Sequence, residues 1–487
     1  MSLRERCGVY GVYSDDEDAF PYLYWGMLAQ NHRGHQSHGF ATLNGVIKVY
    51  TELGLIPPIT ESGIESRVKQ LRGNRGIGNV RYATSGSSDV RSLKRDAMPI
   101  LDSDGGKSVA VAFNGNVVNV RDLQDAVGVD RSYSDAHALC RLILGELRDT
   151  GSVAEAARSC MEIVDGSFAV TGLTDDGVLF AFKDPVGVKP LCYGCREGVT
   201  AFSSESVGLD INEIDLEREI TPGEAMTIED GTLTKEQVMP CRRKAFCAFE
   251  FAYFARPDSI FDHRYVYEAR RDFGANLAKR YSDIASKCEV VISLPETAND
   301  AAYGFHEESR LPWDMATRRH RYVTQRAFIS SFEERSNVVY RKVNILKPRV
   351  RGRRLAVVDD SIVRGDTTRS VVQRLRSAGA QEVHLFITFP RIMGPCPYGI
   401  DMATFGELIG ANREPEEIAR EVDADSVSYQ PIDDYVRATK MPRDQLCLGC
   451  VTGEYPTPLA NRLIREIKER LDNGESEKGR IYEGTRS

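Results

Sequence analysis

Apolar and polar positions alternate with different periods in the two halves of the chain. In the first half, short segments rich in β-branched and aromatic residues begin at Gly8, Ser167 and Val178. An Asp-Gly pair separates the last two segments, and a second such pair lies within ITPGEAMTIEDGTLT. Asp-Gly between segments of this kind is typical of a β-hairpin. The first half is therefore predicted to be rich in β-sheet and to end near residues 235–245.

One helix of the first half can be placed from its apolar face. The face repeats at helical spacing from Asp135 onward, and both Ser134 and Asp135 are able to cap the first turn. The residues of this face are Ala136, Leu139, Cys140, Ile143 and Leu147. A helix is therefore expected to start at Asp135.

The second half has the pattern of a parallel α/β sheet. Apolar strands begin at Val290, Leu355 and Val383, and helical patterns separate them. After the second strand, Gly379 stands where the C-cap of a helix is expected. A charged helix, NRLIREIKERL, is expected from about residue 461. The two halves are predicted to have different folds.

Composition places the chain among ordinary globular proteins. Of 487 residues, 41% are hydrophobic and 28% charged, which excludes a disordered or fibrous chain. The formal net charge of -8 argues against a nucleic-acid binder that depends on bulk positive charge. Apolar runs stay short of the ~18 residues of a membrane span and the first residues do not resemble a signal peptide, so we expect a cytoplasmic location. The 11 cysteines are too sparse for a disulfide scaffold.

The second strand of the α/β half leads into a candidate phosphate-binding turn. LAVVDDSIVRGDTTRSVVQRL places Asp359 and Asp360 at the end of the strand, the edge at which open α/β sheets bind ligands. The two carboxylates can accept hydrogen bonds from sugar hydroxyls or hold hydrated Mg²⁺. Residues 361–368, in which Gly365 allows close backbone approach, can surround a phosphate. The alternative is an ordinary capped turn with solvated acids.

Cys7 precedes the first predicted strand and has two interpretations. It is either a core residue or an N-terminal nucleophile, and the second role requires removal of Met1 to Arg6. An N-terminal cysteine carries its own base, because a free α-amino group with a pKa of about 8 can accept the thiol proton. The residue by itself leaves both interpretations open.

Two CxxC pairs raise the question of a metal site. Cys192 and Cys195 lie in LCYGCREG, which we interpret as a strand end and a turn, and packing is favoured there over metal ligation. The spacing of Cys447 and Cys450 suits zinc, an iron–sulfur cluster or packing. Spacing alone does not decide among the three.

Five segments of the first half, in this order, resemble the glutaminase domain of class II, N-terminal-nucleophile amidotransferases. They are HRGHQSHGF from His32, GIGNVRYATSG from Gly76, FNGN from Phe113, SYSDAH from Ser132 and DPVGVKPL from Asp184. The resemblance implies an α+β fold, the αββα sandwich, with Cys7 as the nucleophile. It also implies that Arg81 binds the glutamine α-carboxylate and Asp135 its α-ammonium group. Asn114 and Gly115 would form the oxyanion hole.

The second half resembles the type I phosphoribosyltransferases, which bind 5-phosphoribosyl-1-pyrophosphate (PRPP). VVDDSIVRG is similar to the version of their signature in amidophosphoribosyltransferases, and SLPETAND is similar to their pyrophosphate loop. The resemblance implies an α/β domain with a parallel sheet, in which Asp359 and Asp360 contact the ribose hydroxyls and Mg²⁺. The residues implied to bind the 5′-phosphate are Ser361, Arg364, Gly365, Thr367 and Thr368.

A basic segment between these motifs, RRHRYVTQRAFI, is similar to the mobile loop that closes over PRPP in the same family. The candidates for neutralising the pyrophosphate are Arg321, Arg326, Arg341 and Lys342.

Four cysteines occur in contexts that resemble those of amidophosphoribosyltransferases with a [4Fe–4S] cluster. The implied ligands are Cys247, Cys396, Cys447 and Cys450. Such a cluster would fasten the interdomain connection and the C-terminal region to the phosphoribosyltransferase core. A zinc site with the same four ligands is the alternative.

The whole resemblance spans about residues 7 to 455 and implies an enzyme of the amidophosphoribosyltransferase family. Its reaction converts glutamine, PRPP and water to 5-phosphoribosylamine, glutamate and pyrophosphate, the opening step of purine synthesis. The implied organisation is a leader, 1–6, a glutaminase domain, 7–240, a phosphoribosyltransferase domain, 241–460, and a charged helix and tail, 461–487. A homotetramer, inhibition by purine nucleotides and an enclosed passage for ammonia are also expected, without nucleic-acid or membrane partners.

Departures from the family motifs leave other functions open. Asn79 and Phe113 stand where histidines are common, His137 where a glutamate is frequent, and Glu296-Thr297 where Asp-Ser is usual. The Glu296-Thr297 loop and the Phe113 context motivate one alternative, a paralogue that keeps only one half-reaction. A catalytically silent sensor of PRPP or nucleotides is a further alternative.

Overall fold

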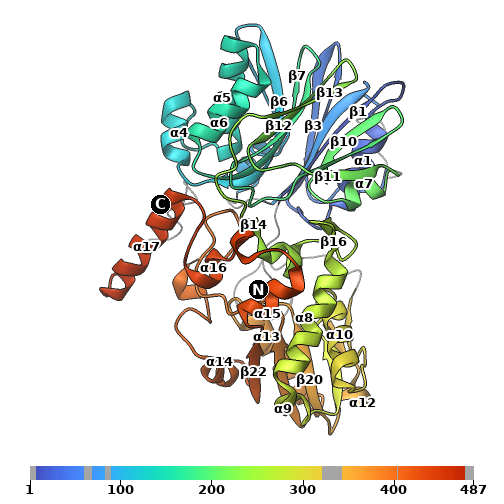
Figure 1. Cartoon of the computed structure of the whole chain (residues 1–487), viewed down its shortest axis with the longest axis vertical. Helices are drawn as coiled ribbons and strands as arrows, with labels where there is room; N and C mark the ends of the chain where they lie inside the picture. The colour runs from blue at the N-terminus through green and yellow to red at the C-terminus, as the bar shows by residue number, and fades with distance from the viewer. Residues whose placement is uncertain (1–6, 60–68, 83–88, 321–342, 403, 478–487) are drawn as a thin grey trace.

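The computed structural model describes residues 7–59, 69–82, 89–320, 343–402 and 404–477. The chain forms two lobes, with a β-sandwich from its first half above a parallel sheet from its second half (Figure 1). Residues 1–6, the expected leader, and 321–342, most of the expected mobile loop, lie outside the described ranges. Among the described residues, every helix is too short or too polar to cross a membrane.

A seven-stranded antiparallel sheet forms one layer of the sandwich, in the order β11-β9-β10-β1-β4-β2-β3. Its strands are β1 (Gly8–Ser14), β2 (Ser37–Asn44), β3 (Val46–Leu53), β4 (Arg75–Arg81), β9 (Cys192–Arg196), β10 (Val199–Ser203) and β11 (Asp215–Glu219). Along β1, Val9 and Tyr13 face the second sheet, while Tyr10 and Val12 face the helices outside. This period of two buries both faces of the strand.

A six-stranded antiparallel sheet forms the second layer, in the order β13-β12-β8-β7-β6-β5. Its strands are β5 (Ile100–Asp104), β6 (Lys107–Val117), β7 (Gly166–Thr174), β8 (Leu179–Lys183), β12 (Glu224–Glu229) and β13 (Thr232–Gln237). Both hairpins expected from Asp-Gly pairs are confirmed, since β7 pairs with β8 around Gly177 and β12 with β13 around Gly231.

Helices cover the outer faces of both sheets and complete the predicted αββα sandwich. The helices on the first sheet are α1 (Phe20–Ala29) and α7 (Val207–Asp210), and those on the second are α4 (Val120–Val127), α5 (Asp135–Thr150) and α6 (Val153–Ile163). Helix α5 begins at Asp135 as predicted, and its apolar face lies in one buried cluster with Val109 and Phe168 of the sheet.

A four-stranded parallel sheet, in the order β17-β20-β21-β22, forms the centre of the second lobe. Its strands are β17 (Val290–Ser293), β20 (Arg354–Asp359), β21 (Glu382–Ile387) and β22 (Ser426–Tyr429). The flanking helices are α8 (Val266–Arg280) and α10 (Asn299–Ser309) on one face, and α13 (Asp366–Ser377) and α14 (Pro415–Glu421) on the other. Helices on both faces explain why these strands read as continuous apolar runs.

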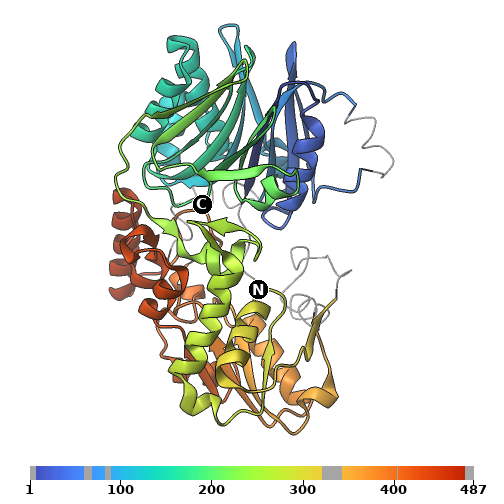
Figure 2. The ribbon, with the colours of Figure 1, turned by 45° about the vertical axis from the view of Figure 1, so that its right-hand side comes forward.

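The two lobes meet at an apolar cluster built mainly from the connection between them and from the C-terminal region. Val118, Val186 and Val188 of the sandwich pack into this cluster. The other elements here are β14 (Phe246–Cys247), the π-helix η1 (Glu250–Phe254), α15 (Ile432–Thr439), β23 (Leu446–Cys447), α16 (Gly449–Thr452) and α17 (Pro458–Asp472). Helix α17 starts a little before the expected residue 461 and lies below the sandwich, at the level of the junction between the lobes (Figure 2).

Short elements complete the chain. They are α3 (Val90–Arg95), β15 (Ile260–Phe261), β16 (Arg264–Tyr265), α9 (Ser282–Ala285), β18 (Thr317–Arg319), β19 (Val343–Ile345), α12 (Lys347–Val350), η2 (Phe405–Glu407) and η3 (Arg443–Gln445).

Candidate active sites and cysteine cluster

Cys7 lies directly before β1, in the sandwich and close to the junction of the lobes. Its thiol is partly buried, 3.6 Å from the backbone oxygen of Tyr82. Burial raises the pKa of the Cys7 thiol, against the opposing positive charges of Arg81 and Lys189. Because a thiol of raised pKa is uncharged at neutral pH, Cys7 needs a base before it can act as a nucleophile.

Arg81 and Asp135 place opposite charges near Cys7. Arg81 ends β4, the strand paired with β1, and Asp135 begins α5; both side chains are buried and both charges act on the Cys7 thiol. Among the described residues, Nη1 of Arg81 is buried without a hydrogen-bond partner. A buried guanidinium and a buried carboxylate that both act on one thiol suit the two ionic groups of a free amino acid.

Asn114 and Gly115 lie on β6, the strand that Cys7 approaches from the first sheet. The side-chain nitrogen and oxygen of Asn114 are both buried, and neither has a hydrogen-bond partner in the described part of the chain. At Gly115, a Cβ atom would stand 2.2 Å from the backbone oxygen of Ser167, so any other residue would displace the neighbouring strand. A side-chain amide and a backbone N–H are the donors that an oxyanion hole requires.

The residues that depart from the family motifs have defined structural roles. Asn79 donates a 3.0 Å hydrogen bond to the backbone oxygen of Gly8 and so holds the chain next to Cys7. Burial lowers the pKa of His137 to about 4, and its Nδ1 lies 3.1 Å from the Ser134 hydroxyl. His137, two residues after Asp135 on α5, is therefore neutral at physiological pH.

Asp359 and Asp360 lie at the carboxyl end of β20, as predicted. Burial raises the pKa of both carboxyl groups, and the negative charge of Asp360 raises that of Asp359 further. The Ser361 hydroxyl donates a 2.6 Å hydrogen bond to Asp360, and the charge of Arg270 opposes the rise at Asp360. Two adjacent acids that repel each other favour a cation or hydroxyl donors as a ligand.

The loop after this acid pair leads directly into α13. Gly365 is the N-cap of the helix with φ 84°, a left-handed conformation that favours glycine. A Cβ atom on Gly365 would stand 2.6 Å from Ile409, so the loop is closely packed at this point. Thr368 is buried in the first turn, and Arg364 pairs with Glu407 at 3.4 Å. The helix N-terminus and the loop N–H groups form an anion-binding geometry.

The expected pyrophosphate loop lies between β17 and α10, at the same edge of the sheet as the acid pair. Glu296 in this loop pairs with Arg319 of β18 at 3.5 Å, and both side chains are exposed. The basic segment therefore begins beside the pyrophosphate loop. The expected charge-neutralising residues Arg321, Arg326, Arg341 and Lys342 lie outside the described residues.

The four cysteines of the expected cluster come together at the junction of the lobes. Cys247 and Cys447 are register partners in the parallel pair β14 and β23, and Cys450 follows on α16. Burial raises the pKa of the Cys450 thiol, and the charges of Cys396, Cys447 and Cys247 raise it further. Among the described residues, however, no group of three or more His, Cys, Asp or Glu side chains is arranged to hold a single metal ion.

The other CxxC pair lies where we expected it. The segment LCYGCREG forms the strand β9, which contains both Cys192 and Cys195, and a turn at 197–198, so the prediction of a strand end and turn is confirmed. Residues three apart on a strand face opposite sides, and these two belong to separate apolar clusters on the two faces of the sheet. They cannot bind one metal ion together, which agrees with packing as the favoured role.

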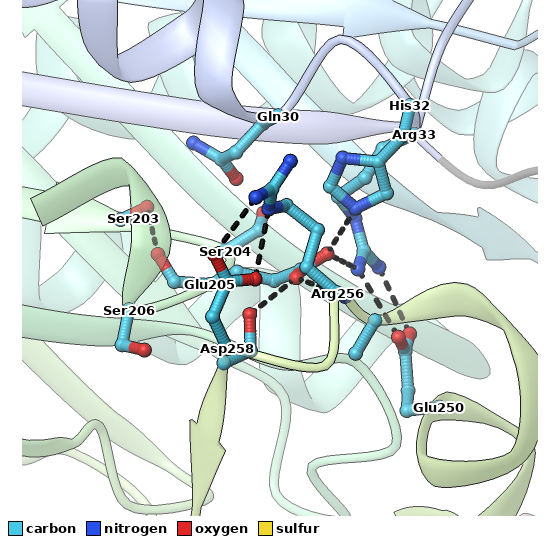
Figure 3. Close-up of polar contacts among 12 residues, drawn as sticks. Gln30, His32, Arg33, Ser203, Ser204, Glu205, Ser206, Glu250, Arg256 and Asp258 are labelled. Atoms are coloured by element: carbon cyan, nitrogen blue, oxygen red, sulfur yellow. Dashed lines mark hydrogen bonds and ion pairs between the residues drawn. The ribbon is translucent and has the colours of Figure 1, made fainter. Parts of the chain in front are cut away.

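Three charged residues near Cys7 were assigned no role from the sequence. Arg33, from the HRG motif, contacts Glu205 and Glu250 (Figure 3). Its Nε donates a 3.2 Å hydrogen bond to the Cys7 carbonyl oxygen. All three side chains are fully buried. The motif signalled that Arg33 matters, but nothing in the sequence pairs it with a residue more than two hundred positions away.

Comparisons with known proteins agree with this geometry. A model of the glutamine amidotransferase domain matches residues 87–210. The amidophosphoribosyltransferase of Methanothermobacter thermautotrophicus is 34% identical over 464 residues, 94% of this chain and 96% of the relative. That of Archaeoglobus fulgidus is 37% identical over 458 residues, 92% of this chain and 98% of the relative.

Two solved structures are similar over nearly the whole chain. Glutamine PRPP amidotransferase from B. subtilis, complexed with ADP and GMP, has a TM-score of 0.83 at 31% identity and covers 93% of this chain and 98% of its own. A structure described as the allosteric regulatory enzyme of purine biosynthesis has a TM-score of 0.84 at 32% identity, covering 93% and 97%.

Proposed function

The chain belongs to the amidophosphoribosyltransferase family, whose reaction is the first step of purine biosynthesis, and from this premise we propose which of its residues carry out the two half-reactions. The enzyme is a glycosyltransferase with glutamine amidotransferase activity. It uses glutamine, PRPP and water and forms 5-phosphoribosylamine, glutamate and pyrophosphate.

In the glutaminase half-reaction, Cys7 is the nucleophile. Its α-amino group, freed by removal of residues 1–6, accepts the thiol proton, and the sulfur attacks the amide carbon of glutamine. Arg81 and Asp135 bind the α-carboxylate and α-ammonium groups, while the Asn114 amide and the Gly115 N–H stabilise the oxyanion. Ammonia leaves from a glutamyl thioester, which water then hydrolyses to glutamate.

One observation carries this assignment: buried donors of Arg81 and Asn114 lack partners in the described part of the chain, and the charges of Arg81 and Asp135 act on the Cys7 thiol. Buried polar groups are nearly always hydrogen-bonded, so donors without a protein partner indicate a ligand site.

In the phosphoribosyltransferase half-reaction, Asp359 and Asp360 accept hydrogen bonds from the ribose hydroxyls. The loop residues Ser361, Arg364, Gly365, Thr367 and Thr368 bind the 5′-phosphate. Either carboxylate of the acid pair would also hold Mg²⁺, which neutralises charge on the departing pyrophosphate when it is bound. Ammonia attacks C1 of the ribose, and this step needs no protein nucleophile.

We propose that Cys247, Cys396, Cys447 and Cys450 hold a [4Fe–4S] cluster. The four thiols lie close enough together that Cys396, Cys447 and Cys247 all act on Cys450, which would suit a ligand set of four cysteines. The cluster would crosslink the connection between lobes to the C-terminal region. A zinc site remains the alternative that metal analysis decides.

We also propose, from the family, how the chain is divided into domains and how it is regulated. We propose the leader 1–6, the domains 7–240 and 241–460 and the helix and tail 461–487. The relative solved with ADP and GMP supports inhibition by purine nucleotides. A homotetramer and an enclosed ammonia passage between the lobes are proposed from the family alone.

Intact mass spectrometry of active protein tests whether the leader is removed. A chain that retains Met1 while using glutamine would contradict the role of Cys7.

One experiment tests whether both half-reactions are present and coupled. Pyrophosphate release from PRPP is measured with glutamine and, separately, with ammonium at alkaline pH. Release with both nitrogen donors is expected. Release with ammonium alone would favour a chain that lacks the glutaminase half-reaction, and nucleotide binding without any release would favour a sensor.

A further inference from the structure

Between the lobes lies a buried cluster of charges that the proposed half-reactions do not use. The side chains of Arg33, Glu205 and Glu250 are each fully buried (Figure 3). Arg33 and Glu205 belong to the sandwich, whereas Glu250 begins η1 on the connection to the second lobe. Ions removed from water are costly unless they are paired and hydrogen-bonded, so the three positions depend on one another.

Glu250 binds Arg33 through two oxygens. Its Oε1 accepts a 2.9 Å hydrogen bond from Nη2 of Arg33, and its Oε2 accepts a 3.1 Å hydrogen bond from Nη1. This two-pronged geometry fixes the plane of the guanidinium as well as its position. Glu205 contacts the same Nη1 and accepts hydrogen bonds from the backbone N–H of Arg256 at 3.0 Å and the hydroxyl of Ser259 at 2.6 Å.

The Nε edge of the Arg33 guanidinium faces the backbone of Cys7. Nε of Arg33 donates a 3.2 Å hydrogen bond to the backbone oxygen of Cys7. The next residue, Gly34, is packed so closely on β4 that a Cβ atom there would stand 2.6 Å from the backbone nitrogen of Arg81. The orientation of Arg33 therefore determines where the Cys7 backbone lies relative to Arg81.

The other end of this arrangement belongs to the phosphoribosyltransferase lobe. Arg270 of α8, itself buried, donates hydrogen bonds to the backbone oxygens of Phe251 at 2.9 Å and Ala255 at 2.7 Å. These two hydrogen bonds fix the position of η1, the element that contains Glu250, relative to α8. The charge of Arg270 also acts on Asp360 of the acid pair. An unbroken series of contacts thus joins the second lobe to Cys7.

We propose that Glu250 is a positioning residue of the glutaminase site: by orienting Arg33 it sets the Cys7 backbone in the geometry required for attack on glutamine. The inference rests on the proposed role of Cys7 as nucleophile. If Glu250 has this role, the connection between the lobes directly affects the rate at which the glutamyl thioester forms. Glutamine binding itself belongs to Arg81 and Asp135.

The test compares Glu250→Gln with the unmodified enzyme. The substitution keeps the size of the side chain but removes its charge and one acceptor. We expect kcat for glutamine hydrolysis to fall roughly 10- to 100-fold, the range associated with misplacement of a reacting group by about 1 Å. The KM for glutamine and the rate of ammonia-dependent synthesis should each stay within about threefold, because their binding groups are unchanged.

A matched control separates positioning from general loss of stability. Asp272→Asn removes a carboxylate of α8 that pairs with buried Arg264 of β16. This change should leave glutamine hydrolysis unchanged. Glu250→Asp keeps the charge and should restore part of the lost kcat. If Glu250→Gln is insoluble, Glu250→Asp decides alone, with at least a threefold fall in kcat expected at unchanged KM.

Two results would overturn the inference: an unchanged glutaminase kcat in the Glu250 variants, or an equal fall in glutamine- and ammonia-dependent rates. Neither result would affect the assignment of Cys7. That assignment fails separately, if Cys7→Ala still hydrolyses glutamine.

Discussion

The side-chain amide of Asn116 donates a 2.8 Å hydrogen bond to the backbone oxygen of Pro397. Asn116 follows the candidate oxyanion residues on β6, and Pro397 follows Cys396 of the candidate cluster. Lys189, another residue of the sandwich, donates to the backbone oxygen of Tyr398, the next residue. The glutaminase domain thus holds the Cys396 segment at two consecutive carbonyl groups, which links the oxyanion strand to the cysteine cluster.

Asn116→Ala should loosen the Cys396 segment. Leaving the buried oxygen of Pro397 without its donor is expected to lower the free energy of unfolding by about 1–3 kcal/mol and to speed the loss of iron in air. Chemical unfolding and timed iron analysis measure the two effects. Asn119→Ala, which removes hydrogen bonds within the sandwich to the backbone oxygen of Ile163 and from the backbone N–H of Asp165, should leave the rate of iron loss unchanged. Equal iron loss in both variants would contradict the link.

Cys7→Ala should abolish glutamine-dependent synthesis and spare ammonia-dependent synthesis, because only the first requires a thiol nucleophile. Pyrophosphate release with each nitrogen donor is the measurement. Cys241→Ala, at an exposed cysteine, serves as the control and should keep both activities. A parallel loss of both activities in Cys7→Ala would argue against two separate sites.

Asp359→Asn should raise the KM for PRPP roughly 10- to 100-fold, since a hydrogen bond to a charged group contributes about 1.5–3 kcal/mol. Basal glutamine hydrolysis should persist, because Asp359 lies in the other lobe. Steady-state kinetics with varied PRPP provide the measurement. Asp433→Asn, an exposed acid of α15, is the control. An unchanged KM for PRPP would refute the assignment of Asp359 to the ribose.

His137 should make the protein less stable in acid. Burial lowers its pKa in the folded chain from 6.5 to about 4. Between these values the unfolded chain binds a proton that the folded chain does not, so stability falls as the pH falls through this window. One such group contributes up to about 1.4 kcal/mol per pH unit. Urea unfolding between pH 4 and 7 should show a smaller pH dependence for His137→Gln, and equal slopes would exclude this origin.

Anaerobically purified protein should contain about four iron atoms and four sulfides per chain, the stoichiometry of a [4Fe–4S] cluster. Replacing Cys450 with serine should reduce both, because one ligand of the set is lost. Metal and acid-labile sulfide analysis supplies the measurement. Stoichiometric zinc without sulfide would instead support a four-cysteine zinc site.

Local features of the sandwich and the α/β lobe were predictable because their causes lie within a few residues. The hairpin at Gly177, the start of α5 at Asp135 and the acid pair at the end of β20 each depend on a turn residue, a cap or an apolar period in a short window. Gly365 also follows this rule, since a loop entering a helix needs its left-handed conformation. The motifs located Cys7, Arg81 and Asp135 without stating how they meet.

The sequence by itself determined the types of element, their order and the groups able to do chemistry. Only the tertiary structure decided that Arg33 is held by Glu250 and faces Cys7, that Cys247 is in register with Cys447, and that Cys192 and Cys195 face opposite sides of one strand. An arginine or glutamate has the same local pattern whether it is solvated or buried. Which residue it pairs with depends on how distant segments pack together, and this packing produces no periodic pattern in the sequence.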